Sequence, residues 1–146
     1  MAQIERSALV MYSAEQMFDL VNDVASYPQF LPGCRGAEIL YSDEHTLEAR
    51  LDLARAGIRQ SFVTRNQLRR PERMLLSLVD GPFADFSGFW QFTPLAESAC
   101  RVTFSLAFSM KNRLVAAAAG KLFSDLANQM VDAMCERAAR VYGEAS

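Results

Sequence analysis

The chain has 146 residues, of which 51% are hydrophobic and 22% charged, and its formal net charge is −2. These values are typical of a globular chain with its own core, so we expect residues 1–146 to form a single domain. The small negative charge excludes a general polyanion binder, and we expect no DNA partner. Neither a signal peptide nor a long apolar run is visible, which indicates a cytoplasmic protein without a membrane-spanning segment.

The N-terminal part predicts a strand followed by two short helices. Residues 4–11 alternate between apolar and polar side chains, which is the strand pattern. Ser13 to Gln16 match the S-x-x-Q capping box, so a helix is expected from there to about Asn22. Prolines limit a second helical turn to about residues 23–30.

From residue 37 the hydrophobic period changes to two, which predicts about six further strands. Short turns join them, so neighbouring strands should pair antiparallel. Each strand has one apolar and one polar side, and we expect the sheet to be covered on one face only. The predicted strands span residues 37–41, 46–53, 58–68, 74–79, 86–93 and 102–110, with a loop from Pro94 to Cys100.

Residues 112–142 predict one long helix, about 45 Å in length at 1.5 Å per residue. Asn112 can cap its start and Gly143 follows its end. A helix of this length needs a large apolar partner, so we predict that the sheet wraps around it. Its apolar stripe comprises Leu114, Val115, Ala119, Leu122, Phe123, Leu126, Met130, Met134, Ala138 and Val141.

Aromatic side chains dominate the predicted inner face of the sheet. Their positions follow from the alternation of the strands, which sends every second residue toward the long helix. Such rings can fill the core completely, or they can wall a pocket between sheet and helix; the pattern leaves both open. The inward set is Phe62, Phe86, Trp90, Phe92, Phe104 and Phe108.

Two segments are more specific than these patterns. They are Tyr27-Pro28-Gln29-Phe30-Leu31-Pro32 and Asp80-Gly81-Pro82-Phe83. With the element order and the long last helix, they resemble the START-like helix-grip superfamily, also labelled polyketide cyclase/dehydrase. Within it, the chain is similar over nearly its whole length to the branch that holds bacterial RatA ribosome-association toxins and mitochondrial coenzyme Q-binding proteins.

The resemblance implies an α+β fold in which a curved antiparallel sheet of about seven strands wraps the C-terminal helix. Two short helices follow the first strand, and an elongated apolar cavity separates sheet and helix. It implies a non-enzymatic protein without cofactor that binds ubiquinone or a related isoprenoid lipid, as a carrier or chaperone supporting respiration. Transient contact with the inner membrane would accompany this role. The alternative is a RatA-type toxin that binds the large (50S) ribosomal subunit, blocks subunit association and so inhibits translation initiation.

For ligand binding, the resemblance places Tyr27, Phe30 and Leu31 on the short helix over one mouth of the cavity. Phe83 lies in a loop near the same opening. The same residues also suit a purely structural role, in which they shape two tight loops and plug the cavity end. The deeper wall is expected to comprise Phe62, Trp90, Phe104, Phe108, Leu122, Leu126 and Met130.

A cluster of arginines is the second candidate surface. Seven arginines and two acidic residues lie between Arg50 and Arg73, a local excess of five positive charges. Arg59 and Arg65 share the outward side of one strand, and Arg69 and Arg70 lie at its end. This patch can contact ribosomal RNA phosphates or anionic lipid. It can equally be a solvated sheet face that blocks edge-to-edge aggregation.

We expect no catalytic residues and no metal site. The single histidine, His45, falls in a predicted turn away from any acidic or cysteine cluster. Cys34 has no histidine near it in the sequence, which disfavours a nucleophile. The three cysteines form no C-x-x-C motif, which predicts free thiols in a reducing compartment.

Overall fold

The computed structural model describes residues 2–143, and its elements follow the predicted order. The first strand, two short helices, six further strands and the long last helix are all present. The elements are β1 (Ala2–Val10), α1 (Ala14–Asn22), the 3₁₀ helix η1 (Val24–Gln29), β2 (Cys34–Ser42), β3 (Thr46–Arg55), β4 (Ile58–Arg69), β5 (Arg73–Asp80), β6 (Phe83–Ala96), β7 (Ala99–Met110) and α2 (Arg113–Tyr142).

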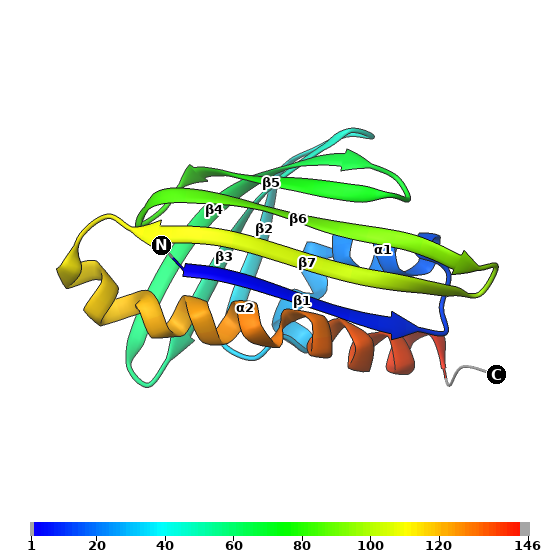
Figure 1. The fold of residues 1–146 in the computed structure, drawn as a ribbon. Coiled ribbons are helices and arrows are strands. Elements are labelled where there is room, and N and C mark those ends of the chain that lie inside the picture. The colour runs from blue at the N-terminus through cyan, green and yellow to red at the C-terminus, as the bar shows by residue number, and fades with distance from the viewer. Residues whose placement is uncertain (1, 144–146) are drawn as a thin grey trace.

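The seven strands form one antiparallel sheet in the order β1-β7-β6-β5-β4-β3-β2. Strands β2 to β7 are neighbours in sequence order, because the turns between them are too short for a crossover. β1 instead pairs with β7, so the first strand is hydrogen-bonded to the last. Figure 1 shows the sheet curving over α2, which runs alongside β1 and β7, with α1 at one end. This is the predicted helix-grip architecture.

The first helix begins at the predicted capping box. The Ser13 hydroxyl accepts a hydrogen bond from the Gln16 backbone N–H, and the Gln16 side chain accepts one from the Ser13 backbone N–H. Met17 and Phe18 of α1 are almost fully buried. The capped helix therefore closes one end of the core, and η1 follows it directly.

The inner face of the sheet is made as the alternation predicts. Phe62 and Trp90 are 7% and 2% exposed, whereas their chain neighbours Ser61 and Gln91 are exposed. Apolar side chains of α2 close this face from the other side. The buried α2 residues are Ala119, Leu122, Phe123, Leu126, Ala127, Met130, Val131, Met134 and Ala138.

Two members of the predicted α2 stripe are wrongly placed by the sequence pattern. Leu114 is 81% exposed and Val141 is 50% exposed. Both lie in the terminal turns of α2, and the first turns of this helix extend beyond the sheet in Figure 1. Within residues 2–143, no helix combines the length and apolarity that a membrane crossing requires.

The predicted loop from Pro94 to Cys100 is also wrong, because β6 continues to Ala96 and β7 begins at Ala99. Proline usually ends a central strand since it cannot donate a ladder hydrogen bond. Here β5 pairs with β6 only between Ser87 and Gln91. Pro94 lies beyond that region and pairs with β7 alone. Its missing N–H therefore does not interrupt the pairing of β6 with β5.

We expect Phe104→Ala to lower the free energy of unfolding by about 3–5 kcal/mol. The ring is 3% exposed and its centroid lies 4.5 Å from that of Trp90, so truncation removes close contacts. Urea unfolding followed by circular dichroism measures the change. Leu114→Ala is the control and should cost less than about 0.5 kcal/mol, because Leu114 is exposed. A Phe104→Ala cost as small as the control's would show that the inner face is not closely packed.

Candidate functional site

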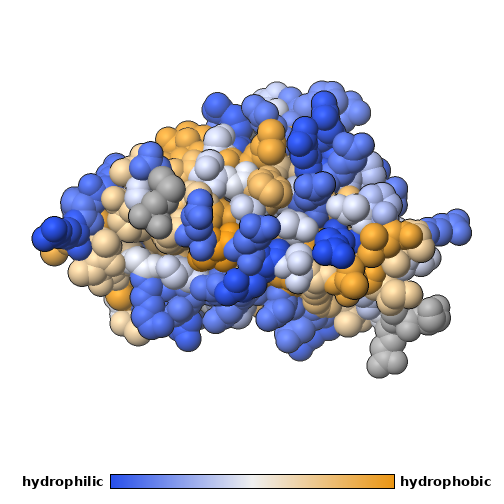
Figure 2. All heavy atoms as spheres, in the orientation of Figure 1, coloured by the Kyte–Doolittle hydropathy of each residue, from blue (hydrophilic) through white to orange (hydrophobic). Residues whose placement is uncertain are grey.

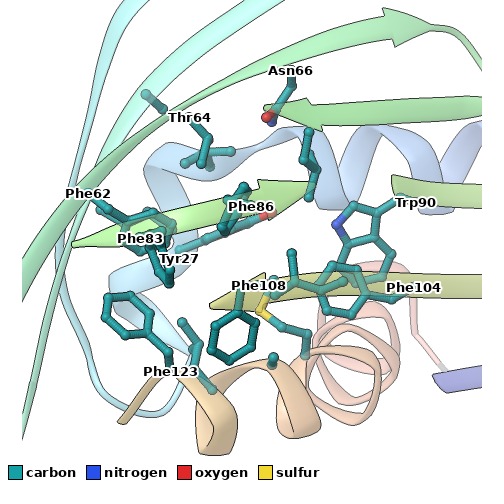
Figure 3. Close-up of a pocket in the computed structure, with 18 residues that line it drawn as sticks. Tyr27, Phe62, Thr64, Asn66, Phe83, Phe86, Trp90, Phe104, Phe108 and Phe123 are labelled. Carbon is teal, nitrogen blue, oxygen red and sulfur yellow. The ribbon is translucent and has the colours of Figure 1, made fainter. Parts of the chain in front are cut away.

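A cavity lies between the concave face of the sheet and α2 (Figure 3). Strands β3 to β7, the helix α2 and the 3₁₀ helix η1 all contribute to its wall. Most of the lining is aliphatic or aromatic, and none of it is a carboxylate, a histidine or a basic side chain. The lining residues are Val24, Tyr27, Ala49, Leu51, Phe62, Thr64, Asn66, Leu76, Phe83, Phe86, Trp90, Phe104, Leu106, Phe108, Phe123, Leu126, Ala127 and Met130.

Aromatic rings form two groups along this wall. Phe123 of α2 packs against Phe83 and Phe62, with ring centroids 4.6 and 5.3 Å apart respectively. Trp90 and Phe104 form the second group, with centroids 4.5 Å apart. Figure 3 shows the two groups on different sides of the cavity. A space lined by both groups remains in the core.

The cavity has a volume of about 80 Å³. A single water needs roughly 10–15 Å³ of such space, and pockets for drug-sized ligands measure roughly 300–1,000 Å³. The core is therefore largely filled, with a residual apolar space. A ligand as large as an isoprenoid lipid can enter only if side chains or α2 move outward.

Besides the indole N–H of Trp90, three polar side chains reach this apolar wall within the described part of the chain: Tyr27, Thr64 and Asn66. The Tyr27 hydroxyl donates a hydrogen bond to the Val21 carbonyl oxygen. Burial, and more weakly the negative charge of Asp23, raise the Tyr27 pKa above its ordinary value of 10.0. Tyr27 is thus a neutral wall residue whose donor is already used.

Asn66 is different from Tyr27 because its Oδ1 is buried and accepts no hydrogen bond from any residue that the structure describes. Sequence reasoning missed both Asn66 and Thr64 as cavity residues. The signal was present, since the alternation that places Phe62 inward on β4 also places residues 64 and 66 inward. Large aromatic side chains dominate the pattern of this face, so the pattern alone does not single out its polar members.

The structure places eight of the eleven predicted cavity residues in the wall: Tyr27, Phe62, Phe83, Trp90, Phe104, Phe108, Leu126 and Met130. Phe83 belongs to β6 and is buried at 4% exposure, so its predicted position in a loop is wrong.

Phe30, Leu31 and Leu122 lie outside the cavity wall. Phe30 is the C-cap of η1 and leaves the helical path, so its ring packs against Tyr27 and beneath the Arg137 guanidinium, 5.0 Å away. Leu31 is buried in the core beside it. Leu122 precedes Phe123, which rotates it about 100° around α2 from the residue that faces the cavity.

The predicted arginine patch is partly neutralised by acidic residues from other strands and helices. Arg65 pairs with Glu48 of β3 at 2.8 Å, and Arg70 makes two hydrogen bonds to Asp19 of α1 at 2.8 and 2.9 Å. The sequence window could not reveal either partner, because both lie outside it. Arg59 also lies on the exposed sheet face, and within residues 2–143 it makes no ion pair.

Arg69 and Arg73 remain as an unusual couple on the outer face. They are direct cross-strand partners in β4 and β5, and both are exposed. Neither makes an ion pair with another described residue. Like charges directly opposite each other in a sheet are destabilising. The pair therefore presents two unneutralised guanidinium groups that favour an anion between them.

The described residues offer no group of three or more histidine, cysteine or acidic side chains placed to hold a metal. Cys34 and Cys100 are free and buried, and burial raises the pKa of each thiol to about 11. A thiol with this pKa carries little thiolate at neutral pH and is a poor nucleophile. His45 lies exposed in the turn between β2 and β3.

The family model described as polyketide cyclase/dehydrase and lipid transport matches residues 10–135. The chain belongs to this family. Within it, the chain is 54% identical to the Persistence and stress-resistance toxin PasT of Escherichia coli, over 97% of this chain and 90% of that protein. It is 50% identical to the Ribosome association toxin RatA of Vibrio cholerae, over 99% of this chain and 100% of that protein.

A more distant relative carries a ligand in its name. The mitochondrial Coenzyme Q-binding protein COQ10 homolog B of Xenopus laevis is 26% identical over 97% of this chain and 59% of its own length. Among solved structures, a START superfamily protein of Mycobacterium smegmatis is 21% identical, with a TM-score of 0.75 over 95% of this chain and 98% of its own. This neighbour supports the helix-grip fold alone.

We expect Tyr27→Phe to lower the free energy of unfolding at neutral pH by about 1–2 kcal/mol, because the Val21 carbonyl loses its donor. The folded pKa of Tyr27 exceeds the unfolded value of 10.0. Its contribution is therefore complete below about pH 10 and is lost as pH rises further. Urea unfolding from pH 8 to 11 should show a steeper loss for the wild type than for the variant. Parallel pH profiles would contradict the buried, neutral Tyr27.

Proposed function

We propose that this protein binds a neutral apolar ligand, ubiquinone or a related isoprenoid lipid, in the cavity beneath α2. It acts as a non-enzymatic carrier or chaperone that supports respiration. The observation that carries the proposal is the cavity wall, in which aliphatic and aromatic side chains meet only three polar ones. The name of the coenzyme Q-binding relative supports the same ligand class.

Burial of an isoprenoid tail is driven by its area, at roughly 25 cal/mol per Å² removed from water. The free energy gained by this burial must exceed the free energy needed to enlarge a cavity of about 80 Å³. The first turns of α2 are the segment best suited to move. Residues 113–118 are all exposed or half-buried, so these turns have little of their surface covered by the rest of the protein.

The same end of the molecule suits contact with a membrane surface. Leu114 is 81% exposed in the first turn of α2, and Lys111 and Arg113 beside it are exposed cations. Lys111 donates its backbone N–H to the Pro82 carbonyl oxygen, which joins this turn to the segment before Phe83 of the cavity wall. An apolar tip flanked by cations suits anionic lipid. We propose that lipid is exchanged here, at the cytoplasmic side of the inner membrane.

The proposal of a non-enzymatic role rests on the chemistry of the wall. Acyl or aldol chemistry of a cyclase needs an acid or a base within reach of the substrate. The described wall offers only Tyr27 as a titratable side chain, and its proton is held by burial and by the Val21 carbonyl. The buried free thiols also suit a reducing cytoplasm.

A second function is favoured by the toxin relatives, which cover almost the whole chain at 50% identity or more. We propose that the protein also associates with the ribosome, at the large subunit, and hinders subunit joining. The outer face of β4 and β5 is the candidate surface. Arg69 and Arg73 lie opposite each other there without acidic partners among the described residues, which suits two phosphates of ribosomal RNA. Cavity and outer face lie on opposite sides of the sheet, so one function does not exclude the other.

For the ligand, we expect Ala127→Phe to abolish quinone retention, because Ala127 lines the cavity at 3% exposure and a phenyl ring would fill the space. The variant should remain folded, at a cost of about 1–3 kcal/mol for overpacking. Quinone in solvent extracts of purified protein is read by its ultraviolet absorbance. Ala118→Phe, on the exposed side of α2, should retain ligand like the wild type. If wild-type protein from quinone-replete cells carries none and takes up none from vesicles, the lipid proposal is wrong.

For the ribosome, we expect Arg69→Gln combined with Arg73→Gln to weaken co-sedimentation with large subunits. The slope of the logarithm of the binding constant against the logarithm of the salt concentration should become shallower by about one to two. The matched control is Arg65→Gln with Arg70→Gln, which removes the same charge from residues that already have acidic partners. The control should weaken binding less. Equal losses in both double variants would mean that overall charge, rather than this surface, governs the association.

A further inference from the structure

Among the described residues, Asn66 is the one buried side chain that carries an amide or a charged group, at 7% exposure. It lies on the inner face of β4 and reaches the apolar cavity, across from the α2 residue Phe123 (Figure 3). Its Oδ1 accepts no hydrogen bond from any described group. The other buried side-chain oxygen without a hydrogen-bond partner among the described residues is Oδ1 of Asn22, which does not line the cavity.

An unpaired amide oxygen at this position is a cost to the fold. Buried polar groups are nearly always hydrogen-bonded, and an exception needs a reason. An apolar residue would avoid the cost, as at Leu51 and Leu76, which line the same wall. Nor can Asn66 turn away, since its backbone is paired with Leu47 of β3 on one side and with Leu76 of β5 on the other. The amide is therefore held at the wall with an unused hydrogen-bonding capacity.

We propose that the Asn66 amide is the polar anchor of the cavity and binds the oxygen of a neutral head group. This inference rests on the proposed lipid-binding function and adds the chemistry of the head. Oδ1 accepts from a hydroxyl group, and the amide turned by half a rotation presents Nδ2 to a carbonyl. Both forms of a quinone, the carbonyl form and the reduced hydroxyl form, can thus be held by one side chain.

The wall around Asn66 restricts the head group further. Among the described residues, no cationic or carboxylate side chain lines the cavity, so a charged head would be buried without a partner. Thr64 lies two residues away on the same face of β4 and adds a hydroxyl beside the amide. The Tyr27 hydroxyl cannot donate to a ligand without losing its hydrogen bond to the Val21 carbonyl oxygen. The preferred ligand is therefore a neutral lipid with a carbonyl- or hydroxyl-bearing ring at β4, and its tail lies among the aromatic rings.

Two probes separate the head from the tail. Decylubiquinone carries the oxygen-bearing ring, and an alkylbenzene with the same tail lacks the oxygens. We expect wild-type protein to bind decylubiquinone about tenfold more tightly than the alkylbenzene, which corresponds to ~1.4 kcal/mol. In Asn66→Leu the ratio of the two affinities should fall to about one, while the affinity for the alkylbenzene stays unchanged. The free energy of unfolding of this variant should be unchanged or higher. Gln67→Leu, on the outward side of β4, is the control and should keep the full preference.

Asn66→Ala repeats the test without the branched side chain, in case leucine disturbs the packing. The anchor is disproved if either folded variant keeps the tenfold preference, or if both probes are weakened equally. It is also disproved if wild-type protein binds the two probes with equal affinity, which would leave the proposed lipid-binding function intact. If wild-type protein binds neither probe, the lipid-binding function itself fails, and the anchor fails with it.

Discussion

The concave face of the sheet and the apolar face of α2 depend on each other for burial. A helix of 30 residues is stabilised in water mainly by packing against tertiary neighbours. The sheet, in turn, has one apolar face that only α2, α1 and η1 can cover within the described chain. Because β1 pairs with β7, the packing of the sheet on α2 also brings the first strand together with the last helix. Any movement of α2 therefore opens the core itself.

The residual cavity follows from the same contact. A curved sheet meets a straight helix closely along its edges and less closely over its centre, where Phe62, Trp90 and Phe104 fill the space. The rings leave a gap of about 80 Å³ between them. A fully stabilised core would close that gap with aliphatic side chains. The small side chains of Ala49 and Ala127 in its wall leave the gap unfilled, and we propose it as the ligand site for that reason.

The sequence predicted the fold well, because its signals are periodic and local. The two-residue alternation of the strands and the Ser13 capping box were sufficient for the inner face and for α1. Contacts between distant residues were harder to predict. The charge count over residues 50–73 does not predict the pairing of Arg65 and Arg70, because Glu48 and Asp19 lie outside that segment.

The predicted cavity residues fall into two groups, those placed by strand alternation and those placed by a motif. Residues placed by strand parity, such as Phe62 and Phe108, are in the wall. Phe30 and Leu31, placed by a motif, lie outside it, since the end of a 3₁₀ helix directs side chains in a way that spacing does not reveal. Asn66 could have been found by parity, but its unpaired oxygen is visible only once all neighbours are known.

We propose that the space beneath α2 takes up a ligand, and Trp90 is placed to report on it directly. Trp90 is the only tryptophan of the chain, is 2% exposed and lines the cavity. Titration of delipidated protein with decylubiquinone should quench its fluorescence saturably, and Ala127→Phe should remove the saturable part. Quenching that rises linearly with quinone, to the same extent in both proteins, would contradict the account.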